Sequence, residues 1–143
     1  MNDIRIEECV TSAALEAVGP VLLELRTHVD PATLSDRVAR ARTSGYRLYG
    51  AWEGARVVGA MGLRPVDNLA FGFHLYVDDL VVRETDRSRG VGEAMIRFAE
   101  QLARGWGAGF LRLDSGFART RAHAFYERIG LPKVGYGFRV GLR

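Results

Sequence analysis

One turn in the sequence has the residue types and the spacing to bind an anion. Arg87-Ser88-Arg89-Gly90-Val91-Gly92 stands between a stretch of strand type and a stretch of helical type. Its two glycines have no side chain to block an anion, and the first amides of the following helix point outward unpaired. Arg87 and Arg89 add positive charge. The turn predicts a phosphate site, although from the glycines alone an ordinary strand-to-helix turn fits equally well.

The turn also carries the coenzyme A signature of the GCN5-related N-acetyltransferase (GNAT) family, which this sequence resembles. The signature reads Gln or Arg, two residues, Gly, one residue, and Gly or Ala, and Arg87, Gly90 and Gly92 match it. Asp79-Leu80-Val81-Val82 stands before the turn in register with the family's coenzyme strand, and residues 122–131 look like the family's last-helix motif. The resemblance is close over residues 74–143.

The resemblance implies an N-acetyltransferase that moves an acetyl group from acetyl-CoA to a primary amine by direct attack in a ternary complex. It implies that main-chain groups of one strand bond the pantetheine arm and that the turn surrounds the pyrophosphate. It also implies that the fourth and fifth strands splay apart, often with a bulge, and that the amide of Val82 or Leu80 polarises the thioester carbonyl. The implied coenzyme-binding residues are Leu80, Val81, Val82, Arg87, Ser88, Arg89, Gly90, Val91, Gly92 and Glu93.

Tyr126 matches the family tyrosine that stands near the coenzyme sulfur. A phenol with an ordinary pKa of about 10 is protonated at neutral pH and can donate a proton to the leaving thiolate. The resemblance therefore implies that Tyr126 is the general acid. Packing beside Phe125 is the structural alternative.

Asp78 and Asp79 are the candidates for the base that accepts the amine proton. Because strand side chains alternate, we expect the two carboxylates to face opposite sides of the sheet, so that only one faces the acceptor easily. Asp78 falls where several amine-acetylating relatives have a glutamate, and the shorter aspartate favours a proton path through water. Asp79 could instead brace the sheet. A structural role for both, or simple attraction of a cationic substrate, remains open.

The composition excludes several classes of protein. The chain has 143 residues, 48% of them hydrophobic and 26% charged, which is typical of one globular domain over residues 1–143. Cys9 is the one cysteine, and the three histidines lack ligand spacing, so we predict no metal site. No apolar run is long enough for a membrane span and no signal peptide is visible, so a cytoplasmic location is expected. Lys133 is the one lysine among twenty basic residues, but these are spread along the chain, which argues against a nucleic-acid partner.

The resemblance implies a GNAT-like α/β (α+β) fold, and the order of strands and helices that the hydrophobic pattern predicts agrees with it. We expect a mixed, mostly antiparallel sheet flanked by about four helices, with a parallel strand-helix-strand unit around the phosphate turn. Gly19-Pro20 is the point at which the first helix is expected to bend or split. The expected strands are residues 3–10, 46–53, 56–64, 71–82, 110–113 and 133–142, and the expected helices begin near residues 11, 30, 91 and 119.

Two departures from the family affect the predicted site and assembly. Arg119 stands where many members have an asparagine, which puts one pantetheine contact in doubt. The chain also ends early for the family, so a final strand is either missing or supplied by a second subunit in a homodimer.

The acceptor and the catalytic competence stay open at this stage. The carboxylates suggest a cationic amine such as a polyamine, an aminoglycoside, a lysine side chain or a protein N-terminus. The alternative to an enzyme is a non-catalytic acyl-CoA binding or regulatory domain, and a basic nucleic-acid binder comes third. Unranked contributors to the acceptor pocket are Glu24, His28, Tyr49, Trp52, His74 and His123.

Overall fold

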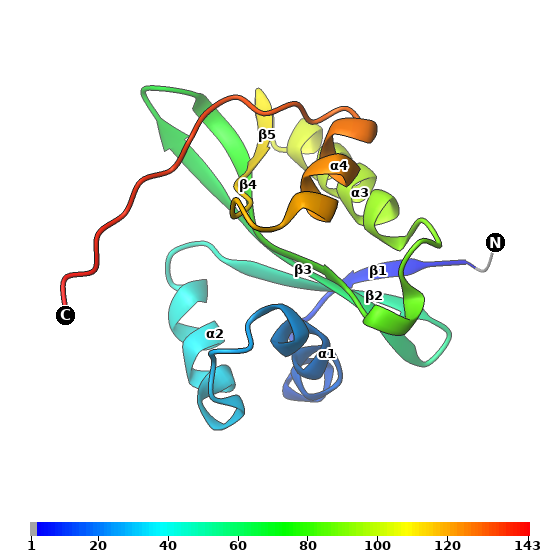
Figure 1. The fold of residues 1–143 in the computed structure, drawn as a ribbon. Helices are drawn as coiled ribbons and strands as arrows, with labels where there is room; N and C mark the ends of the chain where they lie inside the picture. The colour runs from blue at the N-terminus through cyan, green and yellow to red at the C-terminus, as the bar shows by residue number, and fades with distance from the viewer. Residues whose placement is uncertain (1–2) are drawn as a thin grey trace. The chain divides into compact units, whose positions relative to one another are not determined.

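The computed structural model describes residues 3–143 and contains two compact units, residues 1–112 and 113–143. The first unit is built on a five-stranded sheet of order β1-β2-β3-β4-β5 (Figure 1). Strands β1 to β4 pair antiparallel, and the sheet also contains a parallel pair. The predicted mixed α/β fold is therefore confirmed. The strands are β1 (Arg5–Glu8), β2 (Arg47–Glu53), β3 (Arg56–Asn68), β4 (Gly72–Val82) and β5 (Phe110–Leu113).

Three helices of the first unit cover the two faces of this sheet. Helices α1 (Ser12–Leu25) and α2 (Leu34–Arg42) lie on one side and α3 (Val91–Gly105) on the other (Figure 1). The hydroxyl of Thr11 caps α1 by accepting a hydrogen bond from the Ala14 amide at 3.1 Å. Helix α1 runs unbroken through Pro20, so the expected split does not occur.

Short 3-10 turns precede two of the helices. Turn η1 (Pro31–Thr33) leads into α2, and its cap is Asp30, whose carboxylate accepts from the Ala32 amide at 3.0 Å. Turn η2 (Glu84–Asp86) follows β4 and leads to the predicted phosphate turn. The predicted helix start at residue 30 therefore marks η1, and the α-helix begins four residues later.

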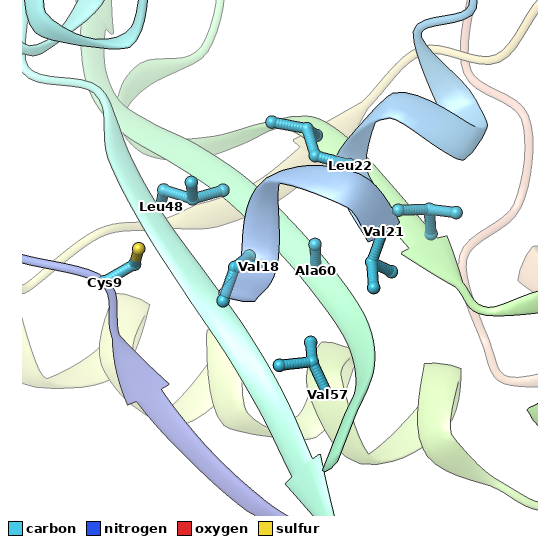
Figure 2. Close-up of a cluster of buried hydrophobic side chains, with 8 residues drawn as sticks. Cys9, Val18, Val21, Leu22, Leu48, Val57 and Ala60 are labelled. Atoms are coloured by element: carbon cyan, nitrogen blue, oxygen red, sulfur yellow. The ribbon is translucent and has the colours of Figure 1, made fainter. Parts of the chain in front are cut away.

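A buried cluster fixes α1 against the middle of the sheet. Val18, Val21 and Leu22 of α1 pack against β2, β3 and β4, and Gly50 lets the helix approach, because an added Cβ there would lie 2.7 Å from Val18 Cγ2. Each fully buried aliphatic side chain contributes about 1.5–3 kcal/mol. The cluster consists of Cys9, Val18, Val21, Leu22, Leu48, Val57, Ala60 and Val81, most of which are labelled in Figure 2.

The opposite face of the sheet holds α3 by the same kind of contact. Met95, Ile96 and Ala99 are fully buried. An added Cβ at Gly59 of β3 would lie 2.8 Å from Met95 Cε, so helix and strand are in close contact there. This packing fixes the N-terminal end of α3, where the predicted phosphate turn lies.

The second unit contains α4 (Thr120–Arg128), and the predicted final strand is wrong. Residues 131–143 have no regular secondary structure. Their apolar side chains do alternate, which is why the sequence favoured a strand, but alternation supplies no neighbouring backbone for a ladder of hydrogen bonds. The alternating residues are all exposed: Val134, Tyr136, Phe138, Val140 and Leu142.

Two kinds of feature are absent among residues 3–143. No helix in this part of the chain is long and apolar enough to cross a membrane. No group of three or more metal-ligating side chains comes together there.

Candidate active site

The predicted phosphate turn, called the nest below, contains two left-handed residues, a backbone feature from which anion-binding nests are built. Ser88 and Gly90 both adopt left-handed conformations, with φ of 66° and 84°. Left-handed residues within a turn direct neighbouring N–H groups to one concave side, where they can bind an anion together. Glycine adopts this conformation without strain, whereas Ser88 carries a cost of about 1 kcal/mol. A serine held in this conformation indicates that the surrounding contacts determine the shape of the turn.

The N-terminus of α3 adds unpaired amides to the nest. Gly90 is the N-cap residue and has no side chain to accept a hydrogen bond from the helix. The first intrahelical bond runs from the Ala94 amide to the Gly90 carbonyl at 3.0 Å. The amides of Val91, Gly92 and Glu93 precede that bond, so they are available to an external acceptor. The positive end of the helix dipole favours an anion there.

The two arginines of the turn have different surroundings. Arg87 is exposed, and its Nε donates a long 3.4 Å hydrogen bond to the Val82 carbonyl. Arg89 forms ion pairs with Asp86, at 2.6 Å, and with Glu53. The sequence predicted that both guanidiniums add charge beside the anion, but that of Arg89 is engaged within the protein, so Arg87 is the better candidate for direct contact.

Asp86 is a site residue that the sequence analysis missed. Its side chain is 2% exposed and accepts two hydrogen bonds from Arg56, at 2.9 and 2.5 Å, one from Arg89 and one from Thr85. The hydrogen bonds from Arg56 lower the pKa of Asp86 below its ordinary value, against the opposing effect of burial. The sequence offered no signal for this role, since Asp86 reads there as part of a polar turn. The carboxylate ties the turn to the β2–β3 hairpin.

Asp86→Asn should loosen the turn, because the neutral amide cannot form the two ion pairs. The free energy of unfolding should fall by about 1–2 kcal/mol, and the loss is limited to this range because solvent partly screens both partner guanidiniums. Since the pKa is depressed in the folded protein, this stabilisation is present above the unfolded-state pKa of about 3.9 and is lost as the pH falls through the folded value. Urea denaturation of the two proteins should therefore converge towards acid pH. Asp67→Asn, at an exposed position, is the control and should have little effect.

The end of β4 presents an open main-chain edge. The Arg83 amide bonds to Val58 of β3 at 2.8 Å, and because successive residues of a strand alternate their polar groups, those of Leu80 and Val82 face away from β3. Strand β5 begins beside Phe73, where the Gly109 amide bonds to the Phe73 carbonyl at 2.9 Å, and it has only four residues. It therefore ends before the level of Leu80.

A bulge in β4 places Asp78 and Asp79 on one face of the sheet. Gly62 pairs with Asp79 and Leu63 with Val77, so Asp78 is an extra residue opposite no partner. An added Cβ at Gly62 would lie 2.5 Å from Asp79 Oδ2, so the Asp79 carboxylate lies on the Gly62 face of the sheet. Arg64 is two residues further along β3 and therefore shares that face, and its side chain bonds the carboxylate of Asp78. The prediction that the two carboxylates face opposite sides is wrong, because the bulge interrupts the alternation.

Asp79 braces the sheet. Its carboxylate accepts a hydrogen bond from Arg26 Nε at 2.8 Å and one from the Tyr46 hydroxyl at 2.7 Å. Burial and the neighbouring Asp79 raise the pKa of Tyr46 well above its ordinary value, so this phenol stays protonated and keeps donating. Arg26 also donates to the Asp78 carbonyl at 2.7 Å, so the end of α1 is bonded to the bulge itself.

Asp78 has the properties that a general base needs. Its carboxylate accepts hydrogen bonds from one donor, Arg64 Nε, at 2.9 and 3.1 Å. Burial raises the pKa of Asp78 above its ordinary value, although Arg64 opposes the shift. A raised pKa makes the carboxylate a stronger proton acceptor.

Tyr126 belongs to the second unit. It lies in α4, is 9% exposed and contacts the Phe125 ring at a centroid distance of 5.3 Å. Burial raises the pKa of the Tyr126 phenol, with the Arg119 guanidinium opposing. The phenol is therefore protonated at neutral pH. Arg119 is the N-cap residue of α4 and makes no side-chain capping bond.

The other residues named for the acceptor pocket have mostly structural contacts. His74 is fully buried, with Nδ1 2.9 Å from the Gly72 carbonyl. Tyr49 is buried and packs against Phe98 at 5.3 Å. Glu24 accepts from the Glu84 amide at 3.2 Å, so it contacts the segment that leads to the phosphate turn.

Comparison with known proteins agrees with this fold. A model of the acetyltransferase (GNAT) family matches residues 15–131, and the chain belongs to that family. It is 34% identical over 122 residues to the uncharacterized N-acetyltransferase YhdJ of Bacillus subtilis (strain 168), covering 84% of this chain and 86% of that protein. It is also 34% identical over 89 residues to human N-acetyltransferase 8, covering 58% of this chain but 37% of that protein. The relatives are thus named as the kind of enzyme that the sequence predicted.

Solved structures share the fold at low sequence identity. The aminoglycoside 6'-N-acetyltransferase AAC(6')-IG of Acinetobacter haemolyticus has a TM-score of 0.79 at 15% identity, over 97% of this chain and 98% of that one. The glucosamine-6-phosphate N-acetyltransferase of Arabidopsis thaliana has a TM-score of 0.77 at 15% identity, over 99% of each chain. At these identities the likeness establishes the fold alone.

Proposed function

We propose that this protein transfers the acetyl group of acetyl-CoA to a primary amine by direct attack of the amine on the thioester. The observation that carries the proposal is the nest around Ser88 and Gly90, which continues into the uncapped N-terminus of α3 beside the open end of β4. An anion site and a free strand edge next to each other suit a ligand with a pyrophosphate and an amide-containing arm.

The residues present fit acetyl-CoA at two places. The amides of residues 90–93 and the exposed Arg87 would bind the pyrophosphate, while Arg89 holds the turn through Asp86 and Glu53. The outward main-chain groups of Leu80 and Val82 would bond the pantetheine amides as an added strand does. The coenzyme supplies an activated acyl group as a thioester.

The chemistry at the amine requires one proton acceptor and one proton donor. The new C–N bond forms at the thioester carbon while the C–S bond breaks, so the amine loses a proton and the thiolate gains one. Asp78 is the base in this proposal, directly or through water, and Tyr126 is the acid. An outward amide of Leu80 or Val82 would stabilise negative charge on the carbonyl oxygen.

A panel of primary amines tests the function. The protein is mixed with acetyl-CoA and each amine, free thiol is measured, and mass spectrometry identifies the acetylated product. Release of thiol in step with the N-acetyl product supports an enzyme. Binding of acetyl-CoA without thiol release across the panel would instead support the non-catalytic acyl-CoA binding domain.

Gly90→Ala should weaken acetyl-CoA binding about 10-fold or more, because a side chain on this left-handed N-cap residue hinders the close approach of the pyrophosphate to the amides of the turn. Gly107→Ala is the matched control: Gly107 follows the same helix at its other end, has a φ of 78° and has no atom within 4 Å of an added Cβ. Both variants carry a similar backbone strain of about 1 kcal/mol. Isothermal titration calorimetry should separate them, and equal losses of affinity would argue against the nest.

A further inference from the structure

The bulge region carries as much positive as negative charge. Asp79 is ion-paired with Arg26 and Asp78 with Arg64, at 2.8 and 2.9 Å. The earlier expectation of a cationic acceptor rested on these two carboxylates, but each of them already has a guanidinium partner. The chemistry of the acceptor must therefore be inferred from what the two arginines leave available.

Arg64 is held in a fixed orientation next to the candidate base. Its Nε donates to both oxygens of Asp78, and its guanidinium lies over the Tyr76 ring with 5.2 Å to the centroid. Its side chain is 40% exposed. Only the Nε of Arg64 is used in the bond to Asp78. The two terminal NH₂ groups make no hydrogen bond with any of residues 3–143.

A guanidinium with both terminal NH₂ groups available is suited to a carboxylate. Two parallel N–H groups match the two oxygens of that anion in a planar, bidentate arrangement, and this geometry is the reason that arginine is preferred for such recognition. Arg26, which is also 40% exposed, places a second positive charge beside the bulge. An anion bound to Arg64 would then lie one guanidinium away from the base.

We infer that the acceptor is a small molecule that carries its reacting amine one carbon from a carboxylate, as an amino acid does, and that Arg64 binds this carboxylate. This inference rests on the proposed function and names its substrate class. Arg64 then orients both the base and the acceptor: Nε binds the Asp78 carboxylate, and the terminal NH₂ groups bind the carboxylate of the acceptor. A carboxylate one carbon from the amine keeps the nitrogen close to Asp78, so the proton can pass to that carboxylate directly or through one water.

Three matched acceptors test the inference: phenylalanine, phenylalaninamide and phenethylamine, which differ in the group beside the amine. Rates are compared as kcat/KM for the unprotonated amine, so that the different amine pKa values do not enter. The wild-type protein should prefer the free acid at least 10-fold over both others. Because the same aromatic group is present in all three, the preference reports on the carboxylate.

Arg64→Gln should abolish that preference through KM for the acid. Loss of Arg64 also changes the surroundings of Asp78 and lowers kcat for every acceptor, but this effect cancels in the ratio between acceptors. Arg64→Lys keeps the charge without the planar fork and should retain part of the preference. Arg5→Gln, at an exposed ion-paired arginine of β1, is the control and should keep the wild-type ratio.

The outcomes separate the inference from the proposed function. Acetylation of phenethylamine or the amide as fast as the acid, or an Arg64→Gln protein that keeps the wild-type ratio, overturns the carboxylate inference and leaves the acetyltransferase standing. Absence of acetylation for every amine tested, with no thiol released, overturns the proposed function itself and the inference with it.

Discussion

Asp78→Asn is expected to lower kcat about 10²–10⁴-fold, the range that a positioned general base contributes. The amide cannot accept the proton that leaves the attacking amine, while its shape still fits the bulge. Because the pKa of Asp78 is raised by burial, the carboxylate becomes protonated, and the activity falls, at a pH above the ordinary range of an aspartate. The wild-type rate should therefore show an acidic limb that the variant lacks.

The pH dependence is measured as the ratio of wild-type to variant kcat, since ionisation of the amine affects both proteins equally. The ratio should decrease as the pH falls through the pKa of Asp78. Asp79→Asn is the matched control: it weakens the hydrogen bonds with Arg26 and Tyr46 and should lower stability, but the acidic limb should remain. A limb that persists in Asp78→Asn and disappears in Asp79→Asn would assign the base to Asp79.

Tyr126→Phe is expected to lower kcat about 10²-fold or more and to leave the Kd for acetyl-CoA unchanged, because the role proposed for the phenol is to protonate the leaving thiolate. The pKa of Tyr126 is raised by burial, so the group stays protonated as the pH rises and loses its proton only above the ordinary range near 10. The wild-type rate should thus hold through mildly alkaline pH. Single-turnover kinetics with a saturating amine, together with calorimetry for the coenzyme, measure the two quantities.

Tyr136→Phe is the control for the acid. Tyr136 lies in the same unit, is 74% exposed and loses the same hydroxyl. It should keep the full rate. If Tyr126→Phe also keeps the wild-type kcat, Tyr126 is a packing residue beside Phe125 and another group protonates the thiolate.

The features that local sequence determines were predicted well. Gly54, with a φ of 61°, marks the hairpin between β2 and β3, and Val91 begins α3 where the apolar stripe begins. Thr11 caps α1 as its residue type and position indicate. Each of these depends on a few adjacent residues whose backbone preferences agree with one another.

The features that depend on distant partners were not predictable in the same way. Asp86 becomes a buried ion-pair residue only because Arg56, thirty positions earlier, reaches it. The face of Asp78 depends on a bulge that the run Val77-Asp78-Asp79-Leu80 does not reveal. The predicted strand at 133–142 had the correct alternation but needed neighbouring main-chain groups, which sequence periodicity cannot supply.

Asp78, the extra residue of the bulge, carries the proposed base but is not needed for the pairing of β3 with β4. Since Leu63 already pairs with Val77 and Gly62 with Asp79, a chain from which residue 78 is deleted could close the gap with every other pair of β3 and β4 unchanged. Such a chain would keep its core and its nest. A relative that differs by this one-residue gap would thus retain the architecture while losing the carboxylate proposed as the base. If Asp78 is the base, an alignment across this strand therefore indicates turnover where overall similarity does not.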